Sequence, residues 1–226
     1  MIPRGRARTD PATRVMAYAT AAPGGTVCGV STRREFRPGD DGVDPYALLT
    51  ALVVPRPIAW VATVDADGVG NLAPHSFFTV ASHRPPIIAF TSIGTKDTLR
   101  NIRATGEFTV SLVTEDLAEA ANATSASLGP EVDEAEQVGV AMEAGSVVAP
   151  PRVAASPAAL ECRLHSTVGF GASTVIFGEV VAFSVDEAVL DGDHPEFTRL
   201  RPVARLGRDE WGLTPEVIHR PRPGQH

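Results

Sequence analysis

The sequence predicts one mainly β domain, an antiparallel barrel with a few helices at its periphery. Its apolar segments are short, rich in valine, isoleucine, threonine and phenylalanine, and separated by turn residues, which is typical of antiparallel strands. The helical segments are too few to connect a doubly wound parallel sheet. With 226 residues, of which 43% are hydrophobic, the chain is long enough to bury a sizeable core.

The first half of the domain alternates turn signals with apolar runs. Asp44 and Pro45 form an N-cap followed by proline at the first helical position, which predicts a helix to about Val53. Residues 65–68 have the composition of a hairpin turn. Strands are therefore expected at 58–65, at 69–82 with an interruption at Pro74, and at 87–92.

The second half opens with a helix over 96–105 that Gly106 ends, because glycine commonly follows the last helical residue. A strand at 107–114 comes next. An alanine-rich helix at 115–127 and a short acidic helix at 131–139 follow. Later strands are expected at 160–170, 174–185 and 203–206.

Both ends of the chain differ from this domain. Residues 1–40 have no hydrophobic period and contain several Pro and Gly turns, so they are predicted to be a disordered, arginine-rich tail. An organelle transit peptide and a translation start at Met16 are alternatives for this segment. The domain is assigned to residues 41–213 and a C-terminal tail to 214–226.

The charge distribution argues against nucleic-acid binding. Residues 1–37 carry seven arginines and two acidic residues, which leaves a net charge of −12 on the rest of the chain. A body this acidic would repel a phosphate backbone.

No apolar run approaches the roughly 18 residues needed to cross a bilayer. Cys28 and Cys162 belong to no CxxC motif, so we expect both to be free thiols. Free thiols are typical of the reducing cytoplasm, where we expect the protein to be, without membrane association.

The segment 68–73 matches the G-x-G-x-x-A dinucleotide fingerprint. That fingerprint opens a helix and is followed about 20 residues later by an acidic residue. Here Pro74 and further strand-forming residues follow, and residues 86–92 contain no acid. The match is therefore interpreted as a hairpin turn rather than a Rossmann loop.

Residues 91–98 have the chemistry of a phosphate site. A strand ends, Gly94 permits a bend, and a helix begins near Thr95, where unpaired backbone N–H groups attract anions. Ser92, Thr95 and Thr98 add hydroxyls, and Lys96 is the only lysine among 20 basic residues. Ordinary helix capping by Thr95 is the alternative interpretation.

Other catalytic chemistry has little support. The histidines lie on separate segments without the spacing of a metal site, so no metal is expected. Ser76 is not in a nucleophile elbow, and no Ser-His-Asp arrangement is visible.

An ordered series of motifs resembles the flavin reductase-like domain family of FMN-binding split barrels, which includes flavoredoxin-like proteins. The series spans residues 44–212, and its members occur in the same order as in the family. Its motifs are PRPIAWVATV from Pro55, NLAPHSFF from Asn71, KDTLRNI from Lys96, GEFTV from Gly106, NATS from Asn122, LECR from Leu160, GEVV from Gly178 and RPVARLG from Arg201.

The resemblance implies a six-stranded antiparallel, Greek-key split barrel with FMN near a homodimer interface. It also implies two groups of cofactor-binding residues. The first group, the phosphate loop, consists of Thr91, Ser92, Lys96, Asp97 and Thr98; within it, Ser92, Lys96 and Thr98 are the three candidates for contact with the FMN phosphate. The second group, the ring stretch, runs along the isoalloxazine ring; it consists of Asn71, Ala73, Pro74, Ser76 and Phe77. One of Phe77 and Phe78 is expected in the barrel core. Thr79, Ser111 and Ser173 depart from the residues often found in relatives.

The implied function is an FMN-dependent oxidoreductase, an NAD(P)H:flavin reductase that passes reduced flavin to a partner oxygenase or another acceptor. The flavin would carry the chemistry, so no catalytic side chain is required. A flavoredoxin-like electron carrier with permanently bound FMN and a non-catalytic flavin-binding protein are the alternatives.

Overall fold

The computed structural model of the chain describes residues 32–129, 131–221 and 223–224. The chain divides into two compact units, Met1–Pro45 and Tyr46–His226. In the first unit, the described residues 32–44 form turns without a helix or strand. The predictions for residues 1–31, including the alternative start at Met16 and the free thiol of Cys28, lie outside the described residues.

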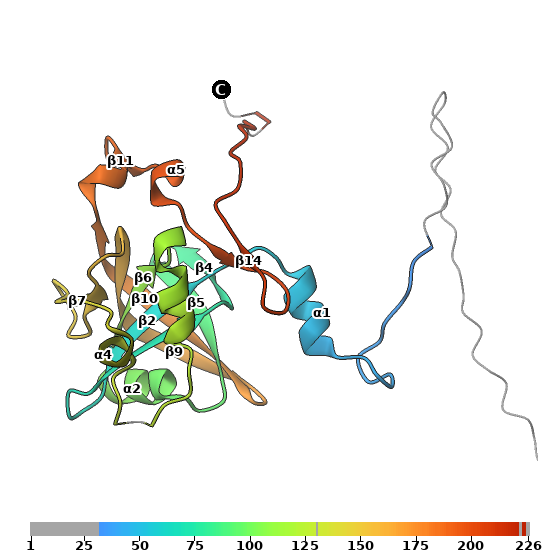
Figure 1. Cartoon of the computed structure of the whole chain (residues 1–226), viewed down its shortest axis with the longest axis horizontal. Helices are drawn as coiled ribbons and strands as arrows, with labels where there is room; N and C mark the ends of the chain where they lie inside the picture. Colours follow the sequence, from blue (N-terminus) through green and yellow to red (C-terminus); the bar gives the residue numbers. More distant parts are fainter. Residues whose placement is uncertain (1–31, 130, 222, 225–226) are drawn as a thin grey trace, which may run out of the picture. The chain divides into compact units, whose positions relative to one another are not determined.

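The second unit is built around a seven-stranded antiparallel sheet, which confirms the mainly β prediction (Figure 1). The strands follow the order β3-β2-β6-β9-β10-β5-β4. Their bounds are β2 (Ala59–Val64), β3 (Gly70–His75), β4 (Phe78–His83), β5 (Pro86–Ile93), β6 (Glu107–Leu112), β9 (Ala158–Phe170) and β10 (Ser173–Val185).

Shorter elements surround the main sheet. A three-stranded sheet consists of β1 (Arg56–Pro57), β13 (Ala204–Arg205) and β14 (Trp211–Gly212). Two further strand pairs are β7 (Met142–Glu143) with β8 (Arg152–Val153), and β11 (Leu190–Asp191) with β12 (His194–Pro195). The helices are α1 (Pro45–Leu52), α2 (Asp97–Thr105), α3 (Ala118–Ala123), α4 (Glu134–Val138) and α5 (Phe197–Leu200), with short 3₁₀ turns η1 (Glu115–Leu117) and η2 (Glu187–Val189).

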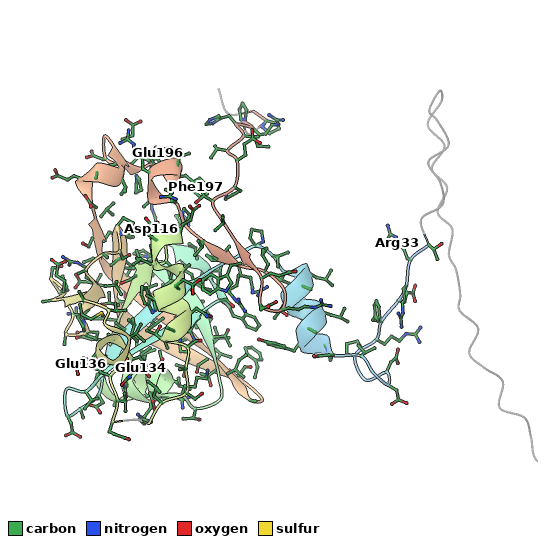
Figure 2. The ribbon with its side chains drawn as sticks, viewed as in Figure 1. Arg33, Asp116, Glu134, Glu136, Glu196 and Phe197 are labelled. Atoms are coloured by element: carbon green, nitrogen blue, oxygen red, sulfur yellow. The ribbon has the colours of Figure 1, made fainter. Side chains whose placement is uncertain are left out.

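The prediction of a six-stranded barrel is wrong in two respects: the main sheet has seven strands, and it remains open between β3 and β4. These strands are its two edges, and within the described residues no ladder joins them. Pro74 has no N–H, and the N–H of Leu72 donates instead to Oε2 of the buried Glu134 at 3.0 Å. The outer edge of β3 is therefore unable to continue the ladder. Figure 2 labels Glu134 and Glu136, both on α4.

The two edges nevertheless meet at one corner. Only Ser76 and Phe77 separate β3 from β4, so His75 and Phe78 lie within about 11 Å of each other. The strand break falls at this corner and not at Pro74, where it was predicted. Pro74 is accommodated inside β3 because β3 is an edge strand, paired on one side only.

Strand β2 separates two hydrophobic cores, and both of its faces are buried. Ala59 and Val61 pack into the first core, together with apolar residues of β5, α2, β6, β9 and β10. Trp60 and Ala62 pack into the second core, which includes Leu72 of β3, Ala121 of α3 and Ala135 of α4. The Trp60 indole Nε1 donates to Thr124 Oγ1 at 2.9 Å and so holds the end of α3 against the sheet.

The helices in the described part of the chain are all too short or too polar to span a membrane.

Candidate functional site

The corner between β3 and β4 joins the two predicted halves of the site. The backbone N–H of Thr91 in β5 donates to the carbonyl of Phe77 at 3.0 Å. Ser92 follows immediately in β5, and residues 94–96 then lead into α2. The structure thus brings the ring stretch at Ser76 and Phe77 next to the strand that ends in the phosphate loop.

The N-terminus of α2 exposes the groups that an anion needs. Lys96 occupies the N-cap position with extended backbone and makes no side-chain cap, so the alternative of Thr95 as the cap is wrong. The first intrahelical bond runs from the N–H of Arg100 to the carbonyl of Lys96. The N–H groups of the preceding three helical residues therefore have no intrahelical acceptor, and they favour a bound anion together with the exposed Lys96 ammonium.

Asp97 lies in the same turn but carries negative charge. Its carboxylate Oδ1 lies 2.5 Å from Nη1 of Arg100, which is half exposed. The helix dipole stabilises a carboxylate at this position, and the carboxylate competes with a phosphate for the same N–H groups. The ion pair to Arg100 offsets part of that competition, and Arg100 is a cation beside the site that the sequence analysis missed.

Two of the predicted phosphate hydroxyls are already engaged inside the protein. Ser92 is fully buried, and its Oγ donates to the carbonyl of Gly94 at 3.2 Å. Thr98 is also buried, and its Oγ1 accepts from Asn71 Nδ2 at 3.1 Å. Among the three phosphate candidates, Lys96 alone presents an exposed side chain; Thr98 contributes its backbone N–H.

Buried polar side chains link the ring stretch to the start of α2. Asn71 Nδ2 lies 3.2 Å from Thr63 Oγ1 and 3.1 Å from Thr98 Oγ1. Asn101 Nδ2 donates to the same Thr63 hydroxyl at 3.2 Å. His75 Nε2 lies 3.4 Å from Thr98 Oγ1. This network connects β3 to the start of α2 through buried hydrogen bonds.

Three members of this network, Thr63, His75 and Asn101, were not predicted as site residues. The sequence signal that could have revealed them is a polar residue at a position where the apolar pattern predicts a core-facing side chain. Thr98 and Asn101 are three residues apart, which places them on one face of α2 beside the buried Leu99 and Ile102. Nothing in the sequence alone indicated that His75 would join them.

His75 is held in its neutral form. Burial lowers the pKa of its imidazole to about 4, the backbone hydrogen bond with Thr91 opposes this, and the Lys96 charge lowers the pKa further. The ring also packs against Phe90, with centroids 4.9 Å apart. A neutral ring at pH 7 suits a position close to an ammonium group.

The ring stretch separates into inward-facing and outward-facing residues. Because Leu72 directs its N–H away from β2, the alternation of an antiparallel ladder directs the backbone groups of Asn71 and Ala73 toward β2. Asn71 turns its side chain into the buried network as well. Pro74 and Ser76 instead line an open cleft.

Phe77 follows Ser76 of the cleft in the chain and belongs to neither hydrophobic core. Its ring centroid is 6.4 Å from that of Tyr46 and 5.9 Å from the Arg56 guanidinium. Phe78 packs against the first core, as expected for one of the two phenylalanines.

The cleft has a volume of about 180 Å³ and includes residues that were not predicted. It is lined by Ile58, Pro74, Ser76, Asn122, Ser125, Arg205 and Trp211. Asn122 and Arg205 belong to motifs that carry the family resemblance, but no role was assigned to them. Ser111 is one of the three residues that differ from those often found in relatives. It is fully buried, and its Oγ accepts from the N–H of Val153 at 3.0 Å, which is a structural role.

The donor set at α2 fits a flavin phosphate. It combines one exposed ammonium with the unpaired backbone N–H groups of a nine-residue helix. A charge-assisted contact together with helix N–H donors is the usual chemistry of phosphate binding. Pro74, Ser76 and Phe77, which are predicted to contact the planar ring, lie at the neighbouring corner.

The chain is similar in sequence and in structure to several known proteins. A protein of Deinococcus radiodurans is 44% identical over 174 residues, covering 72% of this chain and 77% of the relative. The solved structure of nitrilotriacetate monooxygenase component B from Bacillus cereus matches with a TM-score of 0.78 and 29% identity, covering 84% of this chain and 100% of that one. 2-Nitrobenzoate 2-nitroreductase from Pseudomonas fluorescens matches with a TM-score of 0.77 and 29% identity, covering 84% and 97%.

The model of the flavin reductase like domain matches residues 51–199, which include both halves of the candidate site. That span is more than half of the chain and contains the NLAPHSFF and KDTLRNI motifs on which the resemblance was first based. The chain therefore belongs to the flavin reductase like domain family.

Proposed function

We propose that this protein is an FMN-dependent oxidoreductase, an NAD(P)H:flavin reductase. One observation carries the proposal: the Ser76–Phe77 corner is hydrogen-bonded to the strand that leads directly into the Lys96 helix terminus. A flavin mononucleotide has a planar ring at one end and a phosphate at the other, and this arrangement offers a place for each. The similar structures described as a monooxygenase component and a nitroreductase support redox chemistry, and the family of the chain supports flavin as the cofactor.

The residues of the chain have binding and orienting roles in this proposal. A bound flavin would supply the redox chemistry, by taking a hydride from a nicotinamide. Lys96 and the first N–H groups of α2 would hold the phosphate, and the Asn71–Thr98–His75 network would keep that helix terminus at a fixed distance from β3. Orientation of this kind contributes to rate without any acid or base side chain.

The test is a spectrum of the purified full chain followed by titration with NADH and NADPH. Bleaching of bound flavin, or nicotinamide oxidation that requires added FMN, supports the reductase. A yellow protein that is inert to both nicotinamides would instead support electron carriage or flavin storage. A protein that neither contains nor binds FMN overturns the proposal.

A further inference from the structure

Two arginines and a tryptophan lie side by side in the small sheet. Arg56 of β1 is directly opposite Arg205 of β13, and Arg205 is directly opposite Trp211 of β14. Directly opposed residues of antiparallel strands project from the same face. The Arg205 guanidinium carbon lies 5.2 Å from the centre of the Trp211 ring, a cation–π distance.

The two guanidinium groups have no carboxylate partner among the described residues. Arg56 is buried and donates to the carbonyls of Thr50, Val53 and Leu206. Burial lowers the pKa of Arg56, and the charge of Arg205 lowers it further. Like charges directly opposite each other destabilise a sheet. The three carbonyls occupy the Arg56 guanidinium, so Arg205 is the guanidinium that a negative group in the cleft would meet.

Arg205 has the capacity to bind that group. One of its five N–H groups donates to the carbonyl of Arg208 at 2.8 Å, and no other acceptor for it occurs within the described part of the chain. A planar guanidinium stacked on an indole keeps its edge available for a bidentate contact with a carboxylate. The exposed side-chain amide of Asn122 lies on the same cleft.

The cleft that Arg205 and Trp211 line is small. Its volume of about 180 Å³ is below the roughly 300 Å³ at which sites for drug-sized ligands begin, so it suits a single ring rather than a dinucleotide. Its other side is formed by Pro74 and Ser76, the two residues of the ring stretch that face outward. A ligand here would therefore lie beside the bound flavin.

We propose that this cleft binds a small planar aromatic carboxylate, with the carboxylate on Arg205 and the ring against Trp211. The position beside the flavin rests on the proposed function, whereas the binding itself depends only on residues of the cleft. The ligand class is therefore testable separately from turnover.

The experiment compares benzoate with its uncharged isostere benzamide. Each is titrated into the full chain, with and without FMN, and binding is followed by calorimetry and tryptophan fluorescence. We expect benzoate to bind at least ten-fold more tightly than benzamide. Arg205→Gln should remove that preference and leave benzamide binding within two-fold, which also shows that the cleft is intact. Trp211→Leu should weaken both ligands.

Arg103→Gln is the matched control, because it removes the same charge from an exposed position in the last turn of α2. It should leave the benzoate preference unchanged. Equal binding of benzoate and benzamide by the unaltered protein overturns the inference, as does an equal loss in the Arg205 and Arg103 variants. Arg205-dependent binding of 2′,5′-ADP without benzoate binding would identify a nucleotide phosphate site instead.

A separate FMN titration distinguishes the two proposals. Benzoate binding by a protein that does not bind FMN would leave this inference standing and overturn the proposed function. FMN binding without a benzoate preference would do the reverse.

Discussion

Lys96 is the residue on which the phosphate assignment depends most directly. Lys96→Ala should weaken FMN binding by one to two orders of magnitude, because a charge-assisted hydrogen bond contributes roughly 1.5–3 kcal/mol. Riboflavin lacks the phosphate, so its affinity should hardly change. Fluorescence titration of both flavins measures the difference.

Arg103→Ala is the control for this experiment, since Arg103 is an exposed cation at the opposite end of the same helix. Its FMN affinity should match that of the unaltered protein. Equal losses for FMN and riboflavin in the Lys96 variant would contradict the assignment, because they would indicate a general disturbance of the site.

His75 predicts how stability depends on pH. Its pKa is about 4 in the folded protein and 6.5 in an unfolded chain, so between these values the unfolded state binds more protons. Stability from the neutral imidazole is fully present above pH 6.5. About 3 kcal/mol of it should be lost as the pH falls from 6.5 to 4.

Urea unfolding of His75→Gln across that range provides the test. The variant should show a shallower decline than the unaltered protein, because glutamine does not titrate. His194→Gln, which replaces an exposed histidine in β12, controls for the loss of a histidine as such. Parallel pH profiles for the unaltered and His75 proteins would show that the imidazole is not held neutral.

At the scale of the elements, the packing of β6 on β10 depends on one glycine. A Cβ added at Gly178 would lie 2.2 Å from Cζ of Phe108, whose side chain is fully buried in the first core. Gly178→Ala should therefore destabilise the fold by about 1–3 kcal/mol through overpacking. Chemical denaturation measures this change.

Gly169→Ala is its matched control in the neighbouring strand β9, where an added Cβ meets nothing within 4 Å. Its effect should stay within about 0.5 kcal/mol. A Gly178 variant as stable as the Gly169 variant would show that Phe108 shifts without cost.

Local signals predicted most elements well. Helix α1 begins at Pro45, α2 ends before Gly106 with φ +75°, and the turn at Gly68 has φ +88°. The short strands β1, β7, β8, β11, β12 and β14 and the helix α5 were not predicted. Pro74 is a different kind of exception, because a strand break was predicted there on the ground that proline removes a ladder donor. The missing N–H of Pro74 matters only if a second strand pairs with that side of β3. The sequence does not show that β3 is an edge strand, paired with β2 alone.

At the scale of the whole molecule, we propose a homodimer formed by the folded body. Helix α1 and the residue that follows it expose Leu49, Leu52 and Val53, which are 59%, 76% and 60% accessible. Apolar exposure of this kind favours two-fold self-association. The N-terminal segment has no apolar period, and its net charge of +5 would attract the acidic body only through a salt-screened interaction.

A shortened chain that starts near Arg37 keeps α1 and should retain the dimer, the melting temperature and flavin binding. Light scattering, thermal unfolding and an FMN titration measure the three properties. A monomer that still binds flavin would refute the dimer. A large loss of stability on shortening would show that the removed residues are structural.

The sequence by itself determined the class of fold, the positions of the main strands and helices and the family, because these depend on local turn chemistry and on an ordered series of motifs. It also gave the predicted phosphate loop, since a strand end, a glycine and a helix start are consecutive in the chain. Only the tertiary structure decided that the sheet stays open at β3, where Glu134 takes the N–H of Leu72. It alone buried the Thr98 hydroxyl with Asn71 and His75, and it alone placed Arg56, Arg205 and Trp211 on one face. The reason is physical: these contacts join residues from distant segments, and their existence depends on how the strands pair rather than on any local preference.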